Sequence, residues 1–438
     1  MQPRSQRSIL GFWGPLAATW LMMAMEGPLL AAVIARMADP TYNLAAHGVA
    51  WALAILIEAP VMMLMSAATT LVRDRRSYLK LRAFSHGLIA ATTGVLLVLL
   101  IPPVFRWLAD DLMGLPAEVS RVTYSALWYF IPWPGAIGYR RFLQGVLIRS
   151  GRTHLVAYGT VLRLLAMATV ALVGYLAFDL PGASLAALSL ASGVVVEAGA
   201  ARTMAGPSVR ALLSGEVTAA AGSAIRYREI AAFYAPLALT SVIGLAVHPL
   251  LTFFMGRGVA PIESLAVFPV VHALSFVFRS VGLAYQDAAI ALMGERFRHL
   301  PELRRFARTL GLATSGALAL VAVTPLSPFY FETISGLSRE LAAYASTPVL
   351  FIVLLPALTV QLSLQRAILV EARRTRHVTI ASAIEVGSIA LCFLTLGWGI
   401  RVVGVTAAFA SFLFGRIASN AYLAWVCRDA LGGAARSG

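Results

Sequence analysis

Charged side chains are scarce in this sequence. Asp, Glu, Lys and Arg make up 13% of the 438 residues, whereas hydrophobic residues make up 59%. A soluble protein carries about 25% charged residues, because its surface must be covered with polar groups. The low charge and a mean hydropathy of +0.79 therefore exclude a soluble globular protein and predict a chain that folds in a lipid bilayer.

Cysteine and catalytic motifs are also scarce. The two cysteines, Cys392 and Cys427, lie in apolar stretches and give neither a disulfide framework nor the spacing of a metal site. The adjacent acidic pair Asp110 and Asp111 is expected in a solvated outer turn, and no His-x-x-x-His, Cys-x-x-Cys or glycine-rich phosphate loop occurs in a usable context. These absences argue against an enzyme and against a bound metal or cofactor.

Hydrophobic runs long enough to cross a bilayer, about 20 residues each, occur along the whole chain. The first is longer than a signal-peptide core and has no clear cleavage site, so we expect it to be retained. The sequence predicts an all-α polytopic membrane protein with about twelve transmembrane helices. They cover residues 9–35, 47–71, 82–102, 120–147, 154–178, 182–204, 230–255, 263–292, 307–326, 342–369, 377–398 and 402–426.

The chain contains a tandem repeat. Shifted by 221 positions, the stretch from Arg7 to Arg36 aligns without a gap on Arg228 to Arg257, with 11 identities in 30 positions, two prolines among them. Such duplications in transporters give two pseudo-symmetric halves with the substrate path between them. We therefore expect two six-helix lobes at residues 1–204 and 229–438, joined by a cytoplasmic linker at 205–228.

Basic residues outnumber acidic ones, 35 to 20. With the N-terminus in the cytoplasm, 23 basic residues of the loops and termini lie inside and six outside, which is a strong positive-inside signal. The net charge of +15 is thus explained by topology and by contact with anionic lipid headgroups, not by nucleic-acid binding. This predicts a multi-pass protein of the cell (inner) membrane with both termini in the cytoplasm.

Ionisable residues inside the predicted spans are candidates for function. Facing lipid they would each cost several kcal/mol, so such groups usually face a helix bundle or an aqueous cavity. Apart from histidines and from charged residues near the span ends, there are eleven of them: Arg140, Arg141, Arg163, Arg279, Arg366, Arg416, Glu26, Glu58, Glu197, Asp287 and Glu385.

Glu58 and Arg279 occupy equivalent positions of the two repeats at the offset of 221. Because equivalent residues lie at similar distances from the pseudo-symmetry axis, these opposite charges are candidates for a bridge that forms in one access state and breaks in the other. The alternative is that each is neutralised within its own half. Arg163 lies opposite Glu385 within about a residue, which points to the same idea.

Glu26 precedes Gly27 and Pro28 in the middle of the first span, and Pro28 cannot donate a backbone hydrogen bond. A carboxylate at a helix bend suits reversible proton binding. The other repeat carries His248 before Pro249, and His272 lies seven residues before Arg279, so both imidazoles are further candidates. Alternatively, Glu26 bonds a neighbouring helix and His248 caps the broken backbone.

Arg141 aligns with Arg366 at an offset of 225, so a basic position recurs in both halves. Guanidinium groups bind carboxylates and phosphates through two points, and arginines facing the cleft would make it anion-selective. The alternative is that Arg140 or Arg141 snorkels to the cytoplasmic face. Glu197 and Arg416, in the last spans of their halves, are a candidate structural pair.

Several motifs resemble a known superfamily. Phe12-Trp13-Gly14-Pro15-Leu16 and Phe233-Tyr234-Ala235-Pro236-Leu237 open the repeats, and a carboxylate adjoins the central proline of the first span. These features resemble the multidrug, oligosaccharide-lipid and polysaccharide (MOP) exporter superfamily, which includes the multidrug and toxic compound extrusion (MATE) transporters. Within it, four stretches look most like progressive ankylosis (ANK) proteins: Glu26 followed by Leu29 to Ala35, Gly48 to Leu53, Phe233 to Leu239, and Phe268 to His272.

The resemblance implies a V-shaped pair of six-helix lobes that alternate between inward and outward openings. The ankylosis branch is associated with export of small anions such as citrate, pyrophosphate and nucleotides, and the membrane arginines favour such a cargo. Drug-extrusion members exchange organic cations for H⁺ or Na⁺, and their acidic residue at the place of Glu26 is commonly Asp. We expect a monomeric exporter of a small anion coupled to H⁺ or Na⁺. The alternatives are a MATE-type cation or drug antiporter and a lipid-linked oligosaccharide flippase.

Overall fold

The structure is a computed structural model that describes residues 6–214, 225–294 and 297–436. These residues form helices and short turns, with one isolated bridge between Val259 and Val403 as their only β-type pairing. Helices are the expected outcome for apolar runs in lipid, because each run satisfies its own backbone hydrogen bonds.

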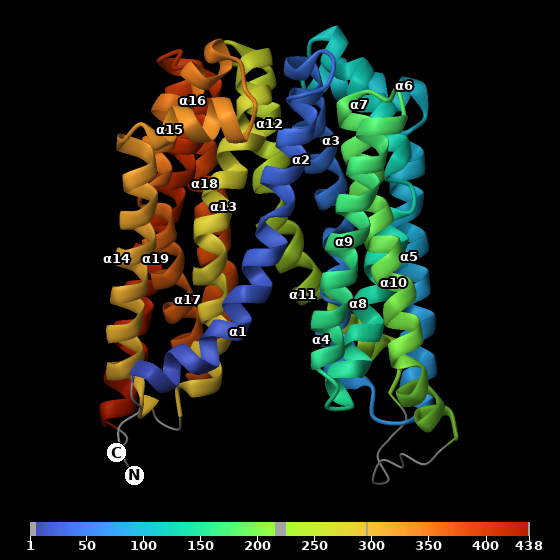
Figure 1. The fold of residues 1–438 in the computed structure, drawn as a ribbon. Coiled ribbons are helices and arrows are strands. Elements are labelled where there is room, and N and C mark those ends of the chain that lie inside the picture. Colours follow the sequence, from blue (N-terminus) through green and yellow to red (C-terminus); the bar gives the residue numbers. More distant parts are fainter. Residues whose placement is uncertain (1–5, 215–224, 295–296, 437–438) are drawn as a thin grey trace. The chain divides into compact units, whose positions relative to one another are not determined.

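The helices follow one another with short connections (Figure 1). In the first repeat they are α1 (Gln6–Ala24), α2 (Glu26–Ile34), α3 (Pro40–Glu58), η1 (Ala59–Val61), α4 (Leu64–Leu71), α5 (Arg75–Leu99), α6 (Pro102–Arg106), η2 (Trp107–Leu112), α7 (Ala117–Tyr129), α8 (Trp133–Arg149), α9 (His154–Ala177) and α10 (Gly182–Ser214). In the second they are α11 (Tyr227–Leu245), α12 (Val247–Gly256), α13 (Pro261–Leu292), α14 (Leu300–Val323), α15 (Leu326–Pro328), η4 (Phe329–Ile334), α16 (Arg339–Ile352), α17 (Leu355–Glu371), α18 (Arg376–Phe393), η5 (Leu394–Gly399) and α19 (Gly404–Arg436).

Each of the twelve predicted spans corresponds to one helix or to consecutive helices separated by a short break. Within the described residues, ten segments are long and apolar enough to cross a membrane. The broken pair α7–α8 and the 33-residue helix α19 account for the other two predicted spans. The prediction of an all-α, multi-pass membrane protein is confirmed.

The helices pack into two compact units. The N unit comprises Met37–Thr252, and the C unit comprises Met1–Arg36 together with Phe253–Gly438. In the C unit α1 packs against α13, as Figure 1 shows, and in the N unit α11 packs against α3, η1, α4 and α5. The packing units thus differ from the repeats in the sequence, because the first span of each repeat packs with helices of the other repeat.

Three features of the sequence prediction fall on or near residues outside the described ranges. Arg4 and Arg296, two of the basic residues expected in the cytoplasm, lie outside them, and so does the middle of the expected linker, residues 215–224. The start of that linker, residues 205–214, continues helix α10.

The backbone repeats itself at a nearly constant offset. The pair α1 and α11 and the starts of α3 and α13 are related by 221 residues, whereas the pairs α8 and α17 and α10 and α19 are related by 222 at both ends. Residues with positive φ recur in the same way, at Asp39 and Ala260 and at Gly151 and Arg373. Because a positive φ is rare outside glycine, its recurrence at Asp39 and Ala260 shows that the two repeats share local geometry as well as sequence.

The repeat extends to the contacts that fix the first spans. In the C unit the indole N–H of Trp13 donates a hydrogen bond to the backbone oxygen of Val281, at 3.0 Å. In the N unit the hydroxyl of Tyr234 donates to the backbone oxygen of Pro60, the equivalent of Val281 at the offset of 221. Each ring also makes an edge-to-face contact with a phenylalanine, on α14 and α5 respectively. The first span of each repeat is therefore held by the same two contacts, a hydrogen bond and an aromatic contact. In each unit the hydrogen bond reaches the span that carries Glu58 or Arg279, near the middle of that span.

Candidate functional site

Glu197 is the centre of a buried ion cluster in the N unit. It lies on α10 and is fully buried, and its carboxylate accepts hydrogen bonds from Arg140 Nη1 at 2.6 Å and Gln144 Nε2 at 3.0 Å. Arg163 Nε, on α9, is 3.6 Å from the same carboxylate. Since α8 places Arg140 and Gln144 four residues apart, both reach Glu197 from one helix face.

Glu58 is a second carboxylate of the N unit. It is the last residue of α3, and the helix gives way to a 3₁₀ turn there because Pro60 lacks a backbone N–H. Glu58 is 5% exposed and interacts electrostatically with Arg140 and Arg141, which lie on α8. Its Oε2 atom accepts no hydrogen bond from any residue that the structure describes. The N unit therefore holds a buried carboxylate that is only partly compensated.

Arg141 is half-buried beside this cluster, and one of its guanidinium nitrogens lies 3.9 Å from Met65 Sδ. Its Nε atom makes no hydrogen bond within the described part of the chain. The cluster contains three arginines against two glutamates: Arg140, Arg141, Arg163, Glu58 and Glu197. It therefore carries a formal positive charge in excess.

The C unit contains a corresponding cluster with fewer carboxylates. Glu385 on α18 pairs with Arg416 on α19, with 2.9 Å between Oε1 and Nη2. Arg279 on α13 donates from Nε to the hydroxyl of Thr359 on α17, at 3.3 Å. The ring of Phe412 stacks under both cations, with the Cζ atoms of Arg279 and Arg416 at 4.8 and 5.5 Å from its centroid. Cation–π contact partly compensates guanidinium groups that lack a carboxylate partner.

Arg366 is the third arginine of the C-unit cluster. It lies on α17, interacts electrostatically with Arg416 and Glu385, and is half-buried. Three buried donors of this cluster, Arg279 Nη1, Arg366 Nε and Arg416 Nε, make no hydrogen bond within the described ranges. Three arginines thus face one glutamate, and unused N–H groups remain that an anion could accept from.

The backbone register places opposite charges at equivalent positions of the two clusters. Because α3 and α13 begin 221 residues apart, Glu58 is the counterpart of Arg279. The pair α9 and α18 begins 222 residues apart, which makes Arg163 the counterpart of Glu385. Charge at these two positions is therefore reversed between the repeats.

The expected equivalence of Arg141 and Arg366 is wrong. Helices α8 and α17 are each 17 residues long and are related by 222, with Pro134 and Pro356 in their first turns. Arg141 consequently aligns with Ser363, and Arg366 aligns with Gln144. The offset of 225 exceeds the structural offset of 222 by three residues, which is about one helical turn. It matched two arginines on the same helix face, because residues three positions apart share a face.

Glu197 and Arg416 are not paired with each other in the structure. Glu197 pairs with Arg140, and Arg416 pairs with Glu385, each within its own unit. At the offset of 222 the counterpart of Glu197 is Ser419 and that of Arg416 is Val194. Neither therefore lies opposite a charge in the repeat, and sequence alignment gave no signal for its partner. The sequence also did not indicate Gln144, Thr359 and Phe412, because an uncharged side chain inside a span gives no signal that separates it from its neighbours.

Glu26 and His248 lie just after the helix breaks expected from the prolines. The first span is interrupted at Met25 and the seventh at Ala246, which are equivalent positions, and Glu26 and His248 are half-buried in the first turns of α2 and α12. A Cβ atom added to Gly27 would come within 2.9 Å of Ala273 Cβ, so glycine allows α2 to approach α13 closely. The bent first span is confirmed, whereas the role of its carboxylate stays a prediction.

His272 lies on α13 between two aromatic rings, with centroids at 6.0 Å from Phe268 and 6.1 Å from Phe276. Its counterpart in the N unit is Trp51, which makes an edge-to-face contact with Trp133. Both repeats thus hold an aromatic ring here, and only the C unit has a titratable one. His272 therefore stays a candidate for proton binding.

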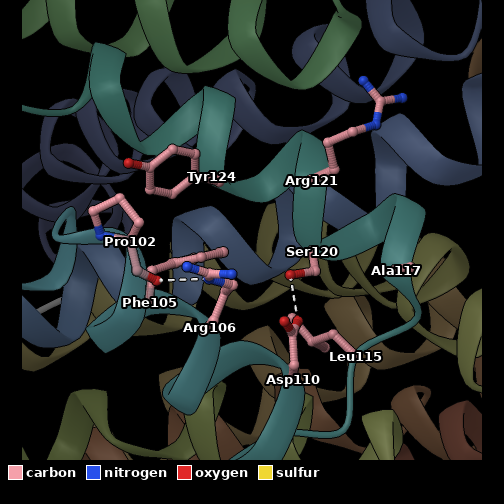
Figure 2. Close-up of a pocket in the computed structure, with 9 residues that line it drawn as sticks. All are labelled: Pro102, Phe105, Arg106, Asp110, Leu115, Ala117, Ser120, Arg121 and Tyr124. Carbon is pink, nitrogen blue, oxygen red and sulfur yellow. Dashed lines mark hydrogen bonds between the residues drawn. The ribbon is translucent and has the colours of Figure 1, made fainter.

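A separate cavity of about 500 Å³ lies in the N unit where α6, η2 and α7 meet (Figure 2). The carboxylate of Asp110 accepts a hydrogen bond from the Ser120 hydroxyl at 2.6 Å and so ties η2 to the first turn of α7. The charged groups of Arg106 and Arg121 point apart in Figure 2. This geometry gives Asp110 a structural role at the end of the bundle, away from the ion cluster of the N unit.

No family model and no curated protein sequence matches this chain. Solved structures do match over almost their whole length. A multidrug resistance MATE family transporter of the MOP superfamily, inward-facing, gives a TM-score of 0.64 at 15% identity, covering 95% of this chain and 96% of that one. A point mutant of the Vibrio cholerae MATE transporter VcmN gives 0.62 at 16% identity, covering 97% and 98%. The lipid II flippase MurJ, inward closed, gives 0.68 at 11% identity, covering 94% and 87%.

At these identities the similarity shows the fold. The chain has the MATE-like fold shared by these transporters, and the predicted fold class is confirmed. The finer resemblance to the ankylosis proteins stays a prediction.

Proposed function

We propose that this protein is a secondary active exporter that works by alternating access and moves a small carboxylate- or phosphate-bearing anion out of the cytoplasm. The observation that carries the proposal is the excess of buried arginine over buried glutamate in the spans of the C unit. Buried cations without matching carboxylates are costly, and an anionic solute that passes through would offset this cost.

The MATE-like fold supports alternating access, because the solved structures with this fold include inward-facing and outward-facing forms of one transporter family. We propose that Glu58 and Arg279 approach each other in one access state, as their equivalence in the repeat permits. Membrane lipids and a coupling ion, H⁺ or Na⁺, complete the set of partners, and we propose a monomer that is not an enzyme.

Transport of citrate in proteoliposomes tests the anion proposal. We expect uptake of labelled citrate that exceeds that of protein-free vesicles and that is competed by pyrophosphate, whereas ethidium is not transported. A pH gradient across the membrane should accelerate citrate movement in one direction. Ethidium transport without citrate transport would contradict the proposal and favour a MATE-type cation or drug antiporter.

A flippase for a lipid-linked oligosaccharide is the second candidate. Its supporting observation is the likeness to the lipid II flippase MurJ, together with arginines suited to a diphosphate. A fluorescent lipid diphosphate reconstituted in the same vesicles separates the two functions. Flipping of this lipid without citrate transport would favour the flippase.

Replacement of Glu26 by glutamine tests proton coupling. If Glu26 binds the coupling proton, the Glu26→Gln variant should retain citrate exchange but lose its acceleration by a pH gradient, because an amide does not titrate in this range. The measurement is the citrate flux against imposed ΔpH, with Glu332→Gln as a control, since Glu332 lies in the π-helical turn η4 outside the predicted spans. An unchanged response to ΔpH in Glu26→Gln would remove Glu26 from the coupling mechanism.

A further inference from the structure

A cavity of about 330 Å³ lies in the C unit among α14, α17 and α19, apart from the ion cluster. Arg304 and Arg308 come from the first turns of α14 and Arg428 comes from the end of α19, and all three line the cavity with exposed side chains. None of its lining residues is acidic. Three guanidinium groups around one cavity form a recess of positive charge.

The nearby carboxylate of Asp429 does not neutralise this recess. Asp429 is adjacent to Arg428 in the sequence, but its Oδ2 pairs with Arg374 Nη1 at 2.5 Å. The arginines of the cavity appear in none of the ion pairs found among the described residues. Their charge is thus available to a ligand.

The polar floor of the cavity has an unused acceptor. Gln365 lines the cavity and is 3% exposed; its Nε2 donates to the backbone oxygen of Asn420 at 3.0 Å. Its Oε1 is buried and receives no hydrogen bond within the part of the chain that the structure describes. A buried amide oxygen without a donor is costly, and a hydroxyl-bearing ligand would supply one.

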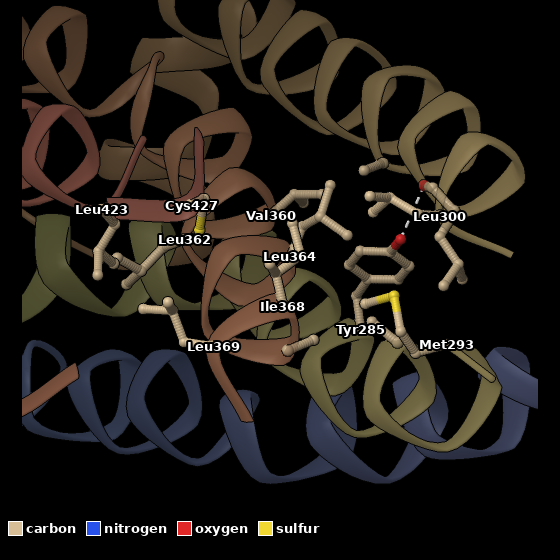
Figure 3. Packing of buried hydrophobic residues seen from close by; sticks show 14 of the residues in the cluster. Tyr285, Met293, Leu300, Val360, Leu362, Leu364, Ile368, Leu369, Leu423 and Cys427 are labelled. Carbon is tan, nitrogen blue, oxygen red and sulfur yellow. Dashed lines mark hydrogen bonds between the residues drawn. The ribbon is translucent and has the colours of Figure 1, made fainter. Parts of the chain in front are cut away.

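The remaining wall is apolar and continuous with the core. Leu364, Ile368 and Cys427 line the cavity and also belong to the buried hydrophobic cluster of the C unit, which Figure 3 shows together with Tyr285. Leu431 adds a partly buried apolar side chain that packs on that cluster. The cavity therefore joins a cationic rim to an apolar wall, which a small inorganic anion would leave unused.

The cavity lies near one end of the membrane helices. Arg304 is four residues from the start of α14 and Gln365 is six residues from the end of α17, so both lie within about 10 Å of a helix end at 1.5 Å per residue. Gln6 Nε2 donates to the backbone oxygen of Glu302 at 3.1 Å, which ties the start of α14 to the start of α1. This is the end predicted to face the cytoplasm, where anionic headgroups meet the hydrocarbon.

We propose that this cavity is a binding site for an anionic phospholipid of the inner leaflet. The headgroup phosphate accepts hydrogen bonds from Arg304, Arg308 and Arg428, and a headgroup hydroxyl donates to Gln365 Oε1. The glycerol backbone and the upper acyl chain pack against Leu364, Ile368 and Leu431. Basic recesses between membrane helices at the cytoplasmic side suit such headgroups. The site does not depend on the proposed transport function.

Native mass spectrometry of the full-length protein, released from vesicles of phosphatidylglycerol and phosphatidylcholine, measures the lipid retained. We expect wild-type protein to retain phosphatidylglycerol preferentially, and the triple variant Arg304→Gln, Arg308→Gln, Arg428→Gln to retain at least about tenfold less. The matched control removes three other exposed arginines, Arg210→Gln, Arg305→Gln and Arg376→Gln. It should retain as much phosphatidylglycerol as the wild type. Equal losses in the two triple variants would show only general attraction of anionic lipid and overturn the site.

A second measurement needs no variant. The thermal unfolding temperature of the wild-type protein in neutral detergent should rise on addition of phosphatidylglycerol, and less on addition of phosphatidylcholine, because ligands of the folded state stabilise it. Inorganic phosphate at millimolar concentration should produce no comparable rise. A rise with inorganic phosphate that phosphatidylglycerol does not add to would identify a site for a soluble anion and overturn the lipid assignment.

Discussion

Replacing Glu197 with alanine is expected to destabilise the N unit more than any other single substitution of a buried carboxylate. The variant leaves Arg140 and Arg163 buried without the carboxylate that pairs with both. Breaking a buried ion pair by removing one partner costs about 3–5 kcal/mol, because the remaining charge loses its closest counter-charge and gains no hydration in exchange. Thermal unfolding in detergent, followed by tryptophan fluorescence and by the monodisperse peak in size exclusion, measures the loss.

Glu118 provides the matched control for this substitution. It pairs with Arg121 at 2.7 Å, but its side chain is 56% exposed, so Glu118→Ala should change stability by less than about 1 kcal/mol. The double variant Glu197→Ala, Arg140→Leu should recover part of the stability that Glu197→Ala loses, because the arginine left without its closest partner is removed as well. A Glu197→Ala protein as stable as Glu118→Ala would show that the cluster is solvated and that its burial does not govern stability.

Much of the fold could be predicted from the sequence because lipid imposes simple rules. Span length, the repeat and the bend before Pro28 all follow from local features, namely apolar runs, matching prolines and the missing proline N–H. The packing of α1 with α13 could not be read in this way. It depends on contacts such as that between Trp13 and Val281, which lie far apart in the sequence and carry no local signal.

The candidate site was predictable only as a set of positions. Charge inside a span identifies Glu58, Arg279 and Glu385, because few other reasons place charge there. Partner choice was not predictable, since it depends on which helix faces meet. Glu197 takes its partners from α8 and α9, and an alignment of the repeats shows no charge at its counterpart, Ser419.

The reversed charges of the two clusters bear on the proposed function. Identical repeats would place like charges at equivalent positions, and these would repel if the equivalent residues approached each other near the pseudo-symmetry axis. Glu58 with Arg279, and Arg163 with Glu385, are opposite in sign at equivalent positions. In the proposed alternating-access mechanism, such positions would serve as contacts that close one side and release the other.

Neutralising Glu58 and Arg279 together should impair transport less than the sum of the single effects. If Glu58 and Arg279 form the proposed contact in one access state, Glu58→Gln and Arg279→Gln each remove it, so each should lower the citrate transport rate by about tenfold or more. The double variant should be no worse than the poorer single variant. That corresponds to a coupling free energy of about 0.5–3 kcal/mol in a double-mutant cycle, as expected for residues that interact. The measurement is the initial rate of citrate flux in proteoliposomes at matched protein content.

The matched control pairs Glu58→Gln with Arg366→Gln, because Arg366 belongs to the same C-unit cluster as Arg279 but is the counterpart of Gln144. Its cycle should show additive effects. Coupling of equal size in both cycles would mean that Glu58 responds to the charge of the whole C-unit cluster. Additive effects in both cycles would mean that the charges of each cluster are compensated within its own unit. Arg279 already has Thr359 and Phe412 as partners. The second outcome would therefore give Arg279 a packing role and leave Arg366 and Arg416 as the arginines of the proposed anion path.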